Sequence, residues 1–183
     1  MESRTVPNVP GDERSASMVQ RSASGDVWSE VVIRPAKPSE AQIIQAILCE
    51  SFEEYRSSYT SAAFQAVVPA ENTIVERMQE GPVWVAVYHD EIVGTISAVP
   101  LANEMQVRMM AVPPAERGKE IGRMLLVHLA KYAFRKGYRR LTLSINPFLT
   151  RAIREYEQFG FERTNEKPAD QHGTPVYIMT KYL

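Results

Sequence analysis

The sequence contains one cysteine, Cys49, among its 183 residues, so no disulfide can form within the chain. A reducing compartment, most simply the cytoplasm, is therefore the expected location. No run approaches the roughly 18 apolar residues that a membrane-spanning helix requires, and the N-terminal stretch carries no apolar segment typical of a secretory signal. These absences argue against a disulfide-stabilised secreted domain and against a membrane protein.

An excess of charge of one sign is also missing. The 21 Lys and Arg residues nearly balance the 22 Asp and Glu residues, for a formal net charge of −1, so no bulk field attracts nucleic acid or an anionic membrane. His89, His128 and His172 are scattered without the spacing of metal ligands, and no metal site is predicted. His128 falls on the apolar face of a predicted helix, where we interpret it as a partly buried packing residue.

Two familiar nucleotide-binding loops are absent as well. The pattern GxxxxGK[ST] does not occur, and no GxGxxG follows a predicted strand. An ATP site and a dinucleotide site are therefore disfavoured.

The composition is otherwise that of a globular protein, with 44% hydrophobic and 23% charged residues. Residues 1–29 are rich in Ser, Pro, Gly and charge and have few large apolar side chains, which predicts a flexible tail. An expression-vector remnant and a partner-binding arm are both left open for this tail. Residues 30–183 are predicted to form one domain, and a homodimer is left open.

Periodic apolar residues predict alternating helices and strands from residue 31 onward. Strands are expected over residues 31–34, 83–88, 92–99, 104–112, 140–145, from 161, and over 176–182. Helices are expected from Pro38 to Phe52, over 70–79, from near Glu120 to the stop at Gly137, and over 151–159. Strands that first meander and then alternate with helices predict an α/β (α+β) fold with a mixed sheet.

The segment from Met109 to Gly122 carries the clearest functional signal. A predicted strand ends in Pro113-Pro114, which cannot continue the ladder, so backbone groups near Val112 are left for a ligand. The chain then turns through Arg117-Gly118-Lys119 into a helix. The first turn of a helix has unpaired N–H groups and partial positive charge, which suit a pyrophosphate, so we expect this segment to bind a phosphate-bearing ligand.

These residues resemble a known family. The run from Arg117 to Gly122 resembles the Gln/Arg-x-x-Gly-x-Gly/Ala signature of the GNAT (GCN5-related) N-acetyltransferases, and Met110 to Pro113 resembles the strand before it. Ala152 with Tyr156, and then Gly160-Phe161, resemble the family's Ala-x-x-x-Tyr and Gly-Phe segments. The resemblance runs from Val31 to Leu183.

The resemblance implies a GNAT-like fold. Its mixed, mostly antiparallel sheet would have six to seven strands with helices on both faces, splayed between the strands ending near Val112 and Ile145. Acetyl-CoA, the implied co-substrate, would lie in the cleft between those strands. The backbone of Met110 and Val112 would pair with the pantetheine arm as an added strand does.

The resemblance also assigns roles to residues. Tyr156 would stand near the thioester sulfur and is the candidate catalytic acid. A backbone N–H near Met110 or Ala111 would stabilise the oxyanion. The candidate residues for binding the coenzyme are Met110, Ala111, Val112, Arg117, Gly118, Lys119, Glu120, Ile121, Gly122, Arg123 and Asn146.

Two positions depart from the family pattern. Glu120 occupies the place of the first signature glycine, where a left-handed backbone would cost a non-glycine residue about 1–2 kcal/mol. Leu149 stands where many members have an asparagine, and Asn146, three residues earlier, is the candidate substitute.

Two functions of different classes follow. The first is an acetyl-CoA-dependent N-acetyltransferase that transfers an acetyl group directly to a primary amine of a small molecule or protein. The alternative is a non-catalytic coenzyme A-binding or sensing domain. Phe52, Tyr55 and Tyr59 are candidate contacts of the acceptor, or alternatively plain packing residues. No general base is identified among Glu53, Glu54, Glu104 and Ser144.

Overall fold

The computed structural model describes residues 30–183, so the expectations for the tail and for its division from the domain lie outside the described residues. The elements follow in chain order. They are β1 (Val32–Pro35), η1 (Pro38–Glu40), α2 (Ala41–Phe52), η2 (Glu53–Ser58), α3 (Ser61–Val67), α4 (Glu71–Glu80), β2 (Val83–Tyr88), β3 (Glu91–Leu101), β4 (Glu104–Ala111), η3 (Pro114–Glu116), α5 (Ile121–Arg135), β5 (Arg140–Ile145), α6 (Thr150–Phe159), β6 (Glu162–Arg163), β7 (Ala169–Gln171) and β8 (Thr174–Tyr182).

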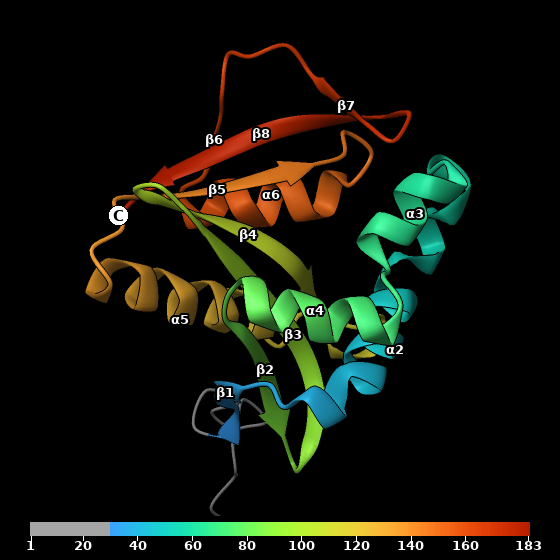
Figure 1. The fold of residues 1–183 in the computed structure, drawn as a ribbon, viewed down its shortest axis with the longest axis vertical. Helices are drawn as coiled ribbons and strands as arrows, with labels where there is room; N and C mark the ends of the chain where they lie inside the picture. The colour runs from blue at the N-terminus through green and yellow to red at the C-terminus, as the bar shows by residue number, and fades with distance from the viewer. Residues whose placement is uncertain (1–29) are drawn as a thin grey trace, which may run out of the picture.

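The strands form one twisted sheet that opens in its middle. The strand order is β1-β2-β3-β4-β5-β8-β6, with β7 paired to β8. Only β4 and β5 run parallel, and their pairing ends at Gln106 and Thr142. Beyond that point the two strands diverge, as Figure 1 shows, which confirms the predicted splay between them.

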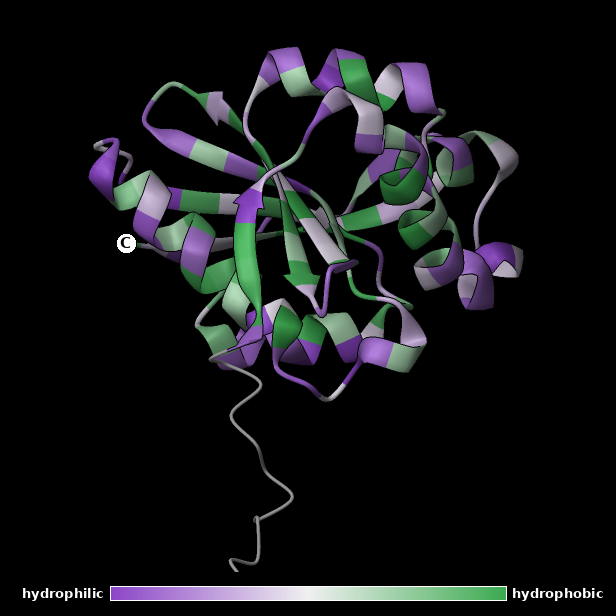
Figure 2. Cartoon of the chain, turned by 90° about the horizontal axis from the view of Figure 1, so that it is seen from below, coloured by the Kyte–Doolittle hydropathy of each residue, from purple (hydrophilic) through white to green (hydrophobic). Residues whose placement is uncertain are grey.

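Each face of the sheet is covered by helices because the strands alternate their side chains. Trp84 and Ala86 pack in the core cluster of α5, whereas Val83 and Val85 pack in the cluster of α2 and α4. Figure 2 shows the hydrophobic residues gathered in the central strands and in the helix faces turned toward them. The expected helices on both faces are therefore confirmed.

A β-bulge interrupts β4 near the open end of the cleft. Thr95 of β3 pairs with Ala111, and Ser97 pairs with Arg108, so three residues of β4 span the distance of two residues on β3. Met109 lies within this bulge and has a positive φ of 45°. A bulge bends its strand and turns the following residues, which changes the faces onto which Met109 and Met110 point.

The predicted helices and strands are present with small shifts, and one α-helix and one strand were not predicted. The sheet has eight strands instead of six to seven, because β7 pairs with β8. All three residues of β7 are exposed, so no apolar alternation marks it in the sequence. Helix α3 has seven residues, of which Ala63 and Phe64 are buried, too few to give a helical period.

Candidate active site

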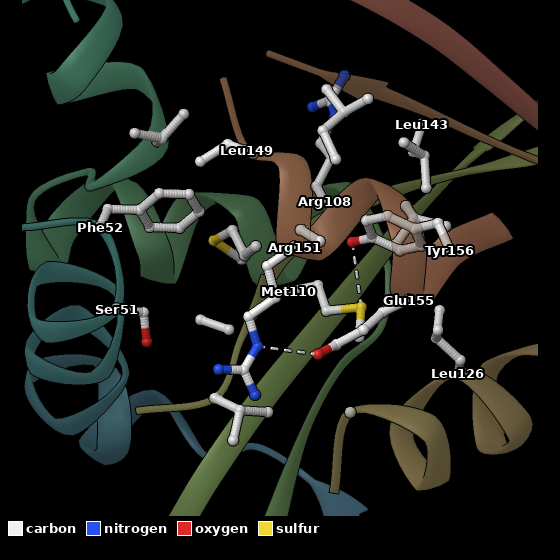
Figure 3. A pocket seen from close by; sticks show the side chains of 18 of the residues that line it. Ser51, Phe52, Arg108, Met110, Leu126, Leu143, Leu149, Arg151, Glu155 and Tyr156 are labelled. Carbon is white, nitrogen blue, oxygen red and sulfur yellow. Dashed lines mark hydrogen bonds and ion pairs between the residues drawn. The ribbon is translucent and has the colours of Figure 1, made fainter. Parts of the chain in front are cut away.

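A cavity of about 570 Å³ lies where β4 and β5 diverge. Its walls come from the second half of β4, the end of β5, the start of α5, α6, and the segment from α2 to α4. Figure 3 shows Tyr156, Met110 and Leu126 on one side of this space and Phe52 and Ser51 on another. The candidate residues from Met110 to Arg123 that line the cavity are Met110, Ala111, Val112, Arg117, Gly118, Glu120, Ile121, Gly122 and Arg123.

The loop before α5 uses two left-handed residues. Gly118 has a φ of 82° with no atom within 4 Å of where a Cβ would stand. Glu120 is the N-cap of α5 with φ 61° and ψ 7°, so the left-handed backbone anticipated for this position is present. For a non-glycine residue this conformation costs about 1–2 kcal/mol. The Glu120 side chain is 55% exposed, which places its carboxylate largely in water.

The first turn of α5 faces the end of β4 at close range. A Cβ on Gly122 would stand 3.4 Å from Met110 Cε and 3.7 Å from a Glu155 carboxylate oxygen. The first intrahelical bond at this end runs from Met124 N–H to the Glu120 carbonyl. The earlier N–H groups of the turn therefore have no helical partner, which is the arrangement that binds phosphate oxygens at helix N-termini.

The cationic side chains around this loop each lie beside a carboxylate. The pairs are Arg117 with Glu54 at 2.6 Å, Lys119 with Glu116 at 2.8 Å, Arg151 with Glu155 at 3.3 Å, and Arg123 with Glu120 at 4.0 Å. Arg117 also donates to the Ser51 carbonyl at 3.2 Å. An anionic ligand would therefore exchange partners with these pairs, and exposed ion pairs of this kind contribute little that opposes the exchange.

Tyr156 projects from α6 into the cleft. Its hydroxyl donates to Met110 Sδ at 3.2 Å (Figure 3). Its ring meets that of Phe161 edge to face. Burial first, and the Glu155 carboxylate second, raise the pKa of this phenol, so it keeps its proton at neutral pH. A thioether sulfur is a weak acceptor, which leaves the proton available to a stronger one.

Asn146 joins three segments at the end of β5. Its Oδ1 accepts from the Tyr59 hydroxyl at 3.0 Å, and its Nδ2 donates to the Pro175 carbonyl at 3.0 Å. Asn146 is buried and lines the cavity. Its proposed contact with the coenzyme stays a prediction, and its observed hydrogen bonds connect β5 to β8 and to the residue after η2.

The carboxylates considered as bases lie in ion pairs. Glu104 accepts from Arg140 at 2.6 Å, Glu53 pairs with Arg56, and Glu54 pairs with Arg117. None of these three carboxylates lines the cavity, whereas Ser144 does.

Aromatic side chains line the cavity away from the α5 loop. Phe52, Tyr55 and Tyr59 all contribute to its wall, and Tyr59 meets Phe148 edge to face at 4.8 Å between ring centroids. The three predicted acceptor contacts are thus brought to one cavity. Burial raises the pKa of Tyr59, which stays a neutral hydrogen-bond donor.

Sequence reasoning missed the polar residues of this same region. Arg77 from α4, Arg108 and Gln106 from β4, and His172 from the turn between β7 and β8 all line the cavity. The strand alternation of β4 contains a signal for two of them, because Gln106 and Arg108 are polar residues spaced by two on a central strand.

His128 lies outside the cavity wall. His128 is half-buried against Trp84, at 5.2 Å between ring centroids, and burial lowers its pKa, which agrees with a packing role. Among residues 30–183 no group of three or more His, Cys, Asp or Glu side chains is arranged to hold a metal ion. Over the same residues no helix has both the length and the apolar composition to cross a membrane.

The model of the acetyltransferase (GNAT) family matches residues 42–161 of the chain. A curated relative, the uncharacterized N-acetyltransferase YjgM of Escherichia coli K12, is 34% identical over 83 residues, which are 43% of this chain and 50% of that protein. The chain therefore spans about half the length of this curated relative.

Solved structures share the fold over most of the chain. The PaiA N-acetyltransferase from Thermoplasma acidophilum in complex with coenzyme A has a TM-score of 0.70 and 20% identity, over 84% of this chain and 99% of that one. A GNAT family acetyltransferase from Elizabethkingia anophelis with acetyl-CoA bound has a TM-score of 0.63 and 20% identity, over 85% of this chain and 99% of that one. At these identities the structures establish the likeness of the fold.

Proposed function

The chain belongs to the GNAT acetyltransferase family, and on that basis we propose that it transfers the acetyl group of acetyl-CoA directly to a primary amine of a small molecule or protein. The observation that carries this proposal is the Tyr156 hydroxyl in the cleft, at the open end of β4 and beside the first turn of α5. That two solved proteins of the same fold hold coenzyme A or acetyl-CoA supports the choice of co-substrate.

Two parts of the coenzyme, the pyrophosphate and the pantetheine arm, have suitable partners in the cleft. The N–H groups from Gly118 to Arg123 would bind the pyrophosphate, and the backbone of Met110 and Val112 would pair with the pantetheine amides, because β4 lacks a β5 partner there. A small residue at Gly122 keeps the first turn open to phosphate oxygens.

The reaction then needs three events in one cavity. The amine nitrogen attacks the thioester carbon, the amide bond forms as the C–S bond breaks, and the amine releases one proton to solvent. Tyr156 donates its proton to the departing thiolate and regains one from solvent. Holding both substrates in one cleft supplies the proximity that such a transfer requires, and an N–H near Met110 or Ala111 stabilises the oxyanion.

A non-catalytic coenzyme A sensor is the second candidate, and two observations favour it. Glu120 places a carboxylate at the N-cap of α5, and the surrounding cations already lie beside carboxylates. The Glu120 carboxylate opposes phosphate binding directly, and the existing ion pairs oppose it to a small extent, relative to a glycine-rich loop with free cations.

Release of free thiol from acetyl-CoA with a panel of amines separates the two functions. An acetyltransferase produces thiol in step with acetylated amine. Binding of acetyl-CoA without any turnover, hydrolysis included, would favour the sensor and overturn the transfer.

A further inference from the structure

Arg108 reaches the cavity from β4, on the side away from the α5 loop. Its Nε and Nη2 both donate to Gln106 Oε1, at 3.0 and 2.7 Å, and its Nη1 donates to Glu80 at 3.1 Å. These contacts hold the plane of the guanidinium and leave N–H groups for a ligand, because a guanidinium has five N–H donors. Figure 3 shows the Arg108 side chain extending along the cavity toward the end of β5.

Arg77 of α4 lines the same region and is half-buried. Its Nη2 donates to the Ala66 carbonyl at 3.2 Å, and no carboxylate of residues 30–183 lies within ion-pair distance of it. Burial first, and the charge of Arg108 second, lower the pKa of Arg77, whereas the Glu80 carboxylate raises it. A half-buried guanidinium without a carboxylate partner, in a cavity wall that holds a second cation, is stabilised by an anion.

The acidic residues of the cavity wall lie elsewhere. The carboxylates that line it are Glu116, Glu120 and Glu155, all at the loop before α5 or on α6. On the opposite side the wall has Arg77 and Arg108, with Glu80 behind Arg108. The local sum of these three groups is one positive charge, which matches a monoanion better than a phosphate dianion.

We propose that the acceptor is a small amine that also carries a carboxylate, as an amino acid does, and that Arg77 and Arg108 bind this carboxylate. The inference rests on the proposed acetyl transfer and narrows its substrate class. A cavity of about 570 Å³, shared with the acyl end of the coenzyme, fits a small molecule. The aromatic wall from Tyr59 and Phe52 would pack against the apolar part of the acceptor.

The same charges exclude a second class of acceptor. A polyamine brings two or more positive charges to a wall whose described residues on this side include two guanidiniums and no carboxylate. Like charges in a partly buried site repel strongly, so polyamines are expected to be poor acceptors. The guanidinium pair also favours the neutral amine over the ammonium ion, which is the form that attacks the thioester.

The test compares L-amino acids with their carboxamides as acceptors for the full chain. Each pair shares its amine and side chain and differs in the negative charge. We expect kcat/KM at least about tenfold higher for the acid in the preferred pairs, since hydrogen bonds to charged groups contribute about 1.5–3 kcal/mol. Carboxamides acetylated as well as the acids, spermidine preferred to both, or carboxamides acetylated while no acid is acetylated would overturn the inference.

Substitutions identify the residues that bind the carboxylate. Arg77→Gln and Arg108→Gln should each raise KM for the acid at least about tenfold and leave KM for the carboxamide within about twofold, with partial rescue in Arg77→Lys. Arg154→Gln, at an exposed position of α6 outside the cavity wall, is the matched control. An equal change in KM for acid and carboxamide would indicate a structural role and overturn the assignment.

A binding measurement keeps this inference separate from the proposed transfer. Calorimetric titration of the full chain with L-amino acids and their carboxamides needs no acetyl-CoA. Preferential binding of the acids, lost in Arg77→Gln, supports the inference even if no acetyl-CoA binds, an outcome that would contradict the proposed transfer alone. Equal binding of acids and carboxamides would overturn the inference.

Discussion

Tyr156 is the residue on which the proposed chemistry depends. Its phenol is held protonated by burial and by Glu155, and its only hydrogen-bond partner among residues 30–183 is the soft sulfur of Met110. The proton is therefore both retained at neutral pH and easily redirected to a thiolate.

Replacement of Tyr156 by Phe removes that proton and keeps the ring. We expect kcat to fall about 10²- to 10⁴-fold, the usual contribution of a positioned acid, with the Kd of acetyl-CoA nearly unchanged. Steady-state kinetics and calorimetry measure the two quantities. Tyr132→Phe, on the Trp84 side of α5, is the control, and an unchanged kcat in Tyr156→Phe would remove the assigned role.

Glu120 combines two effects that substitutions can separate. Glu120→Gly relieves the left-handed strain and should raise the free energy of unfolding by about 1 kcal/mol. Glu120→Gln keeps the left-handed strain and removes the negative charge at the N-cap. It should therefore tighten acetyl-CoA binding and leave the free energy of unfolding without the increase expected for Glu120→Gly. Chemical denaturation and calorimetry test both variants. A weaker coenzyme affinity in Glu120→Gln would show that the carboxylate does not oppose phosphate binding.

At the scale of elements, the turn between β7 and β8 is hydrogen-bonded to the start of α3. Thr60 caps α3 by accepting from Ala63 N–H at 3.1 Å, and its hydroxyl donates to the His172 carbonyl at 2.6 Å. The Tyr59–Asn146–Pro175 hydrogen bonds lie next to this contact and connect the same segments. Together they close the side of the cavity that Tyr59 and His172 line, with short elements that have little core of their own.

Thr60→Ala breaks both hydrogen bonds of this tie. We expect a loss of about 1–2 kcal/mol in the free energy of unfolding, and faster amide exchange in α3 than elsewhere. Thr60→Ser keeps the hydroxyl and should retain most of the stability. Hydrogen exchange that rises equally in α5 and α3 would contradict a local tie.

The sequence predicted elements wherever apolar periodicity or turn residues were strong. Helix α5, its stop at Gly137 and the hairpin of β2 and β3 were predicted because long apolar patterns end at glycine or polar turns. Helix α3 and strand β7 were missed because they are short and mostly exposed. Their positions depend on contacts between distant segments, such as Thr60 with His172, that no local pattern encodes.

The candidate site likewise contains residues that a local motif predicted and residues that it did not. The α5 loop was predicted because Gly118, Gly122 and the preceding prolines form a local motif. The carboxylate partners of the loop's cations were not predicted, because Glu54 of η2 lies beside Arg117 only in the folded chain. Arg77 and Arg108 were missed because nothing in the local sequence distinguishes them from other charged residues. Only the folded structure brings α4 and β4 to one cavity.

For the whole molecule, a formal net charge of −1 conceals a division of charge within one cavity. Carboxylates and cations alternate at the α5 loop, and guanidiniums stand unopposed by cavity-lining carboxylates at the other end of the described wall. The affinity of a ligand that spans this cavity is therefore expected to depend on the local charge at each end, which the overall composition does not reveal.

We propose that residues 30–183 form the functional domain, so deletion of residues 1–29 should leave kcat/KM within about twofold and the free energy of unfolding within about 0.5 kcal/mol. Denaturation and thiol-release assays of the two chains measure this. A large loss of either quantity would assign a role to residues 1–29.

A crystal structure with acetyl-CoA tests the central claim most directly. The account predicts the pyrophosphate on the N–H groups from Gly118 to Arg123, the pantetheine arm between β4 and β5, and the thioester sulfur within hydrogen-bond reach of the Tyr156 hydroxyl. A coenzyme bound outside the cleft between β4 and β5, or with its sulfur remote from Tyr156, would contradict it.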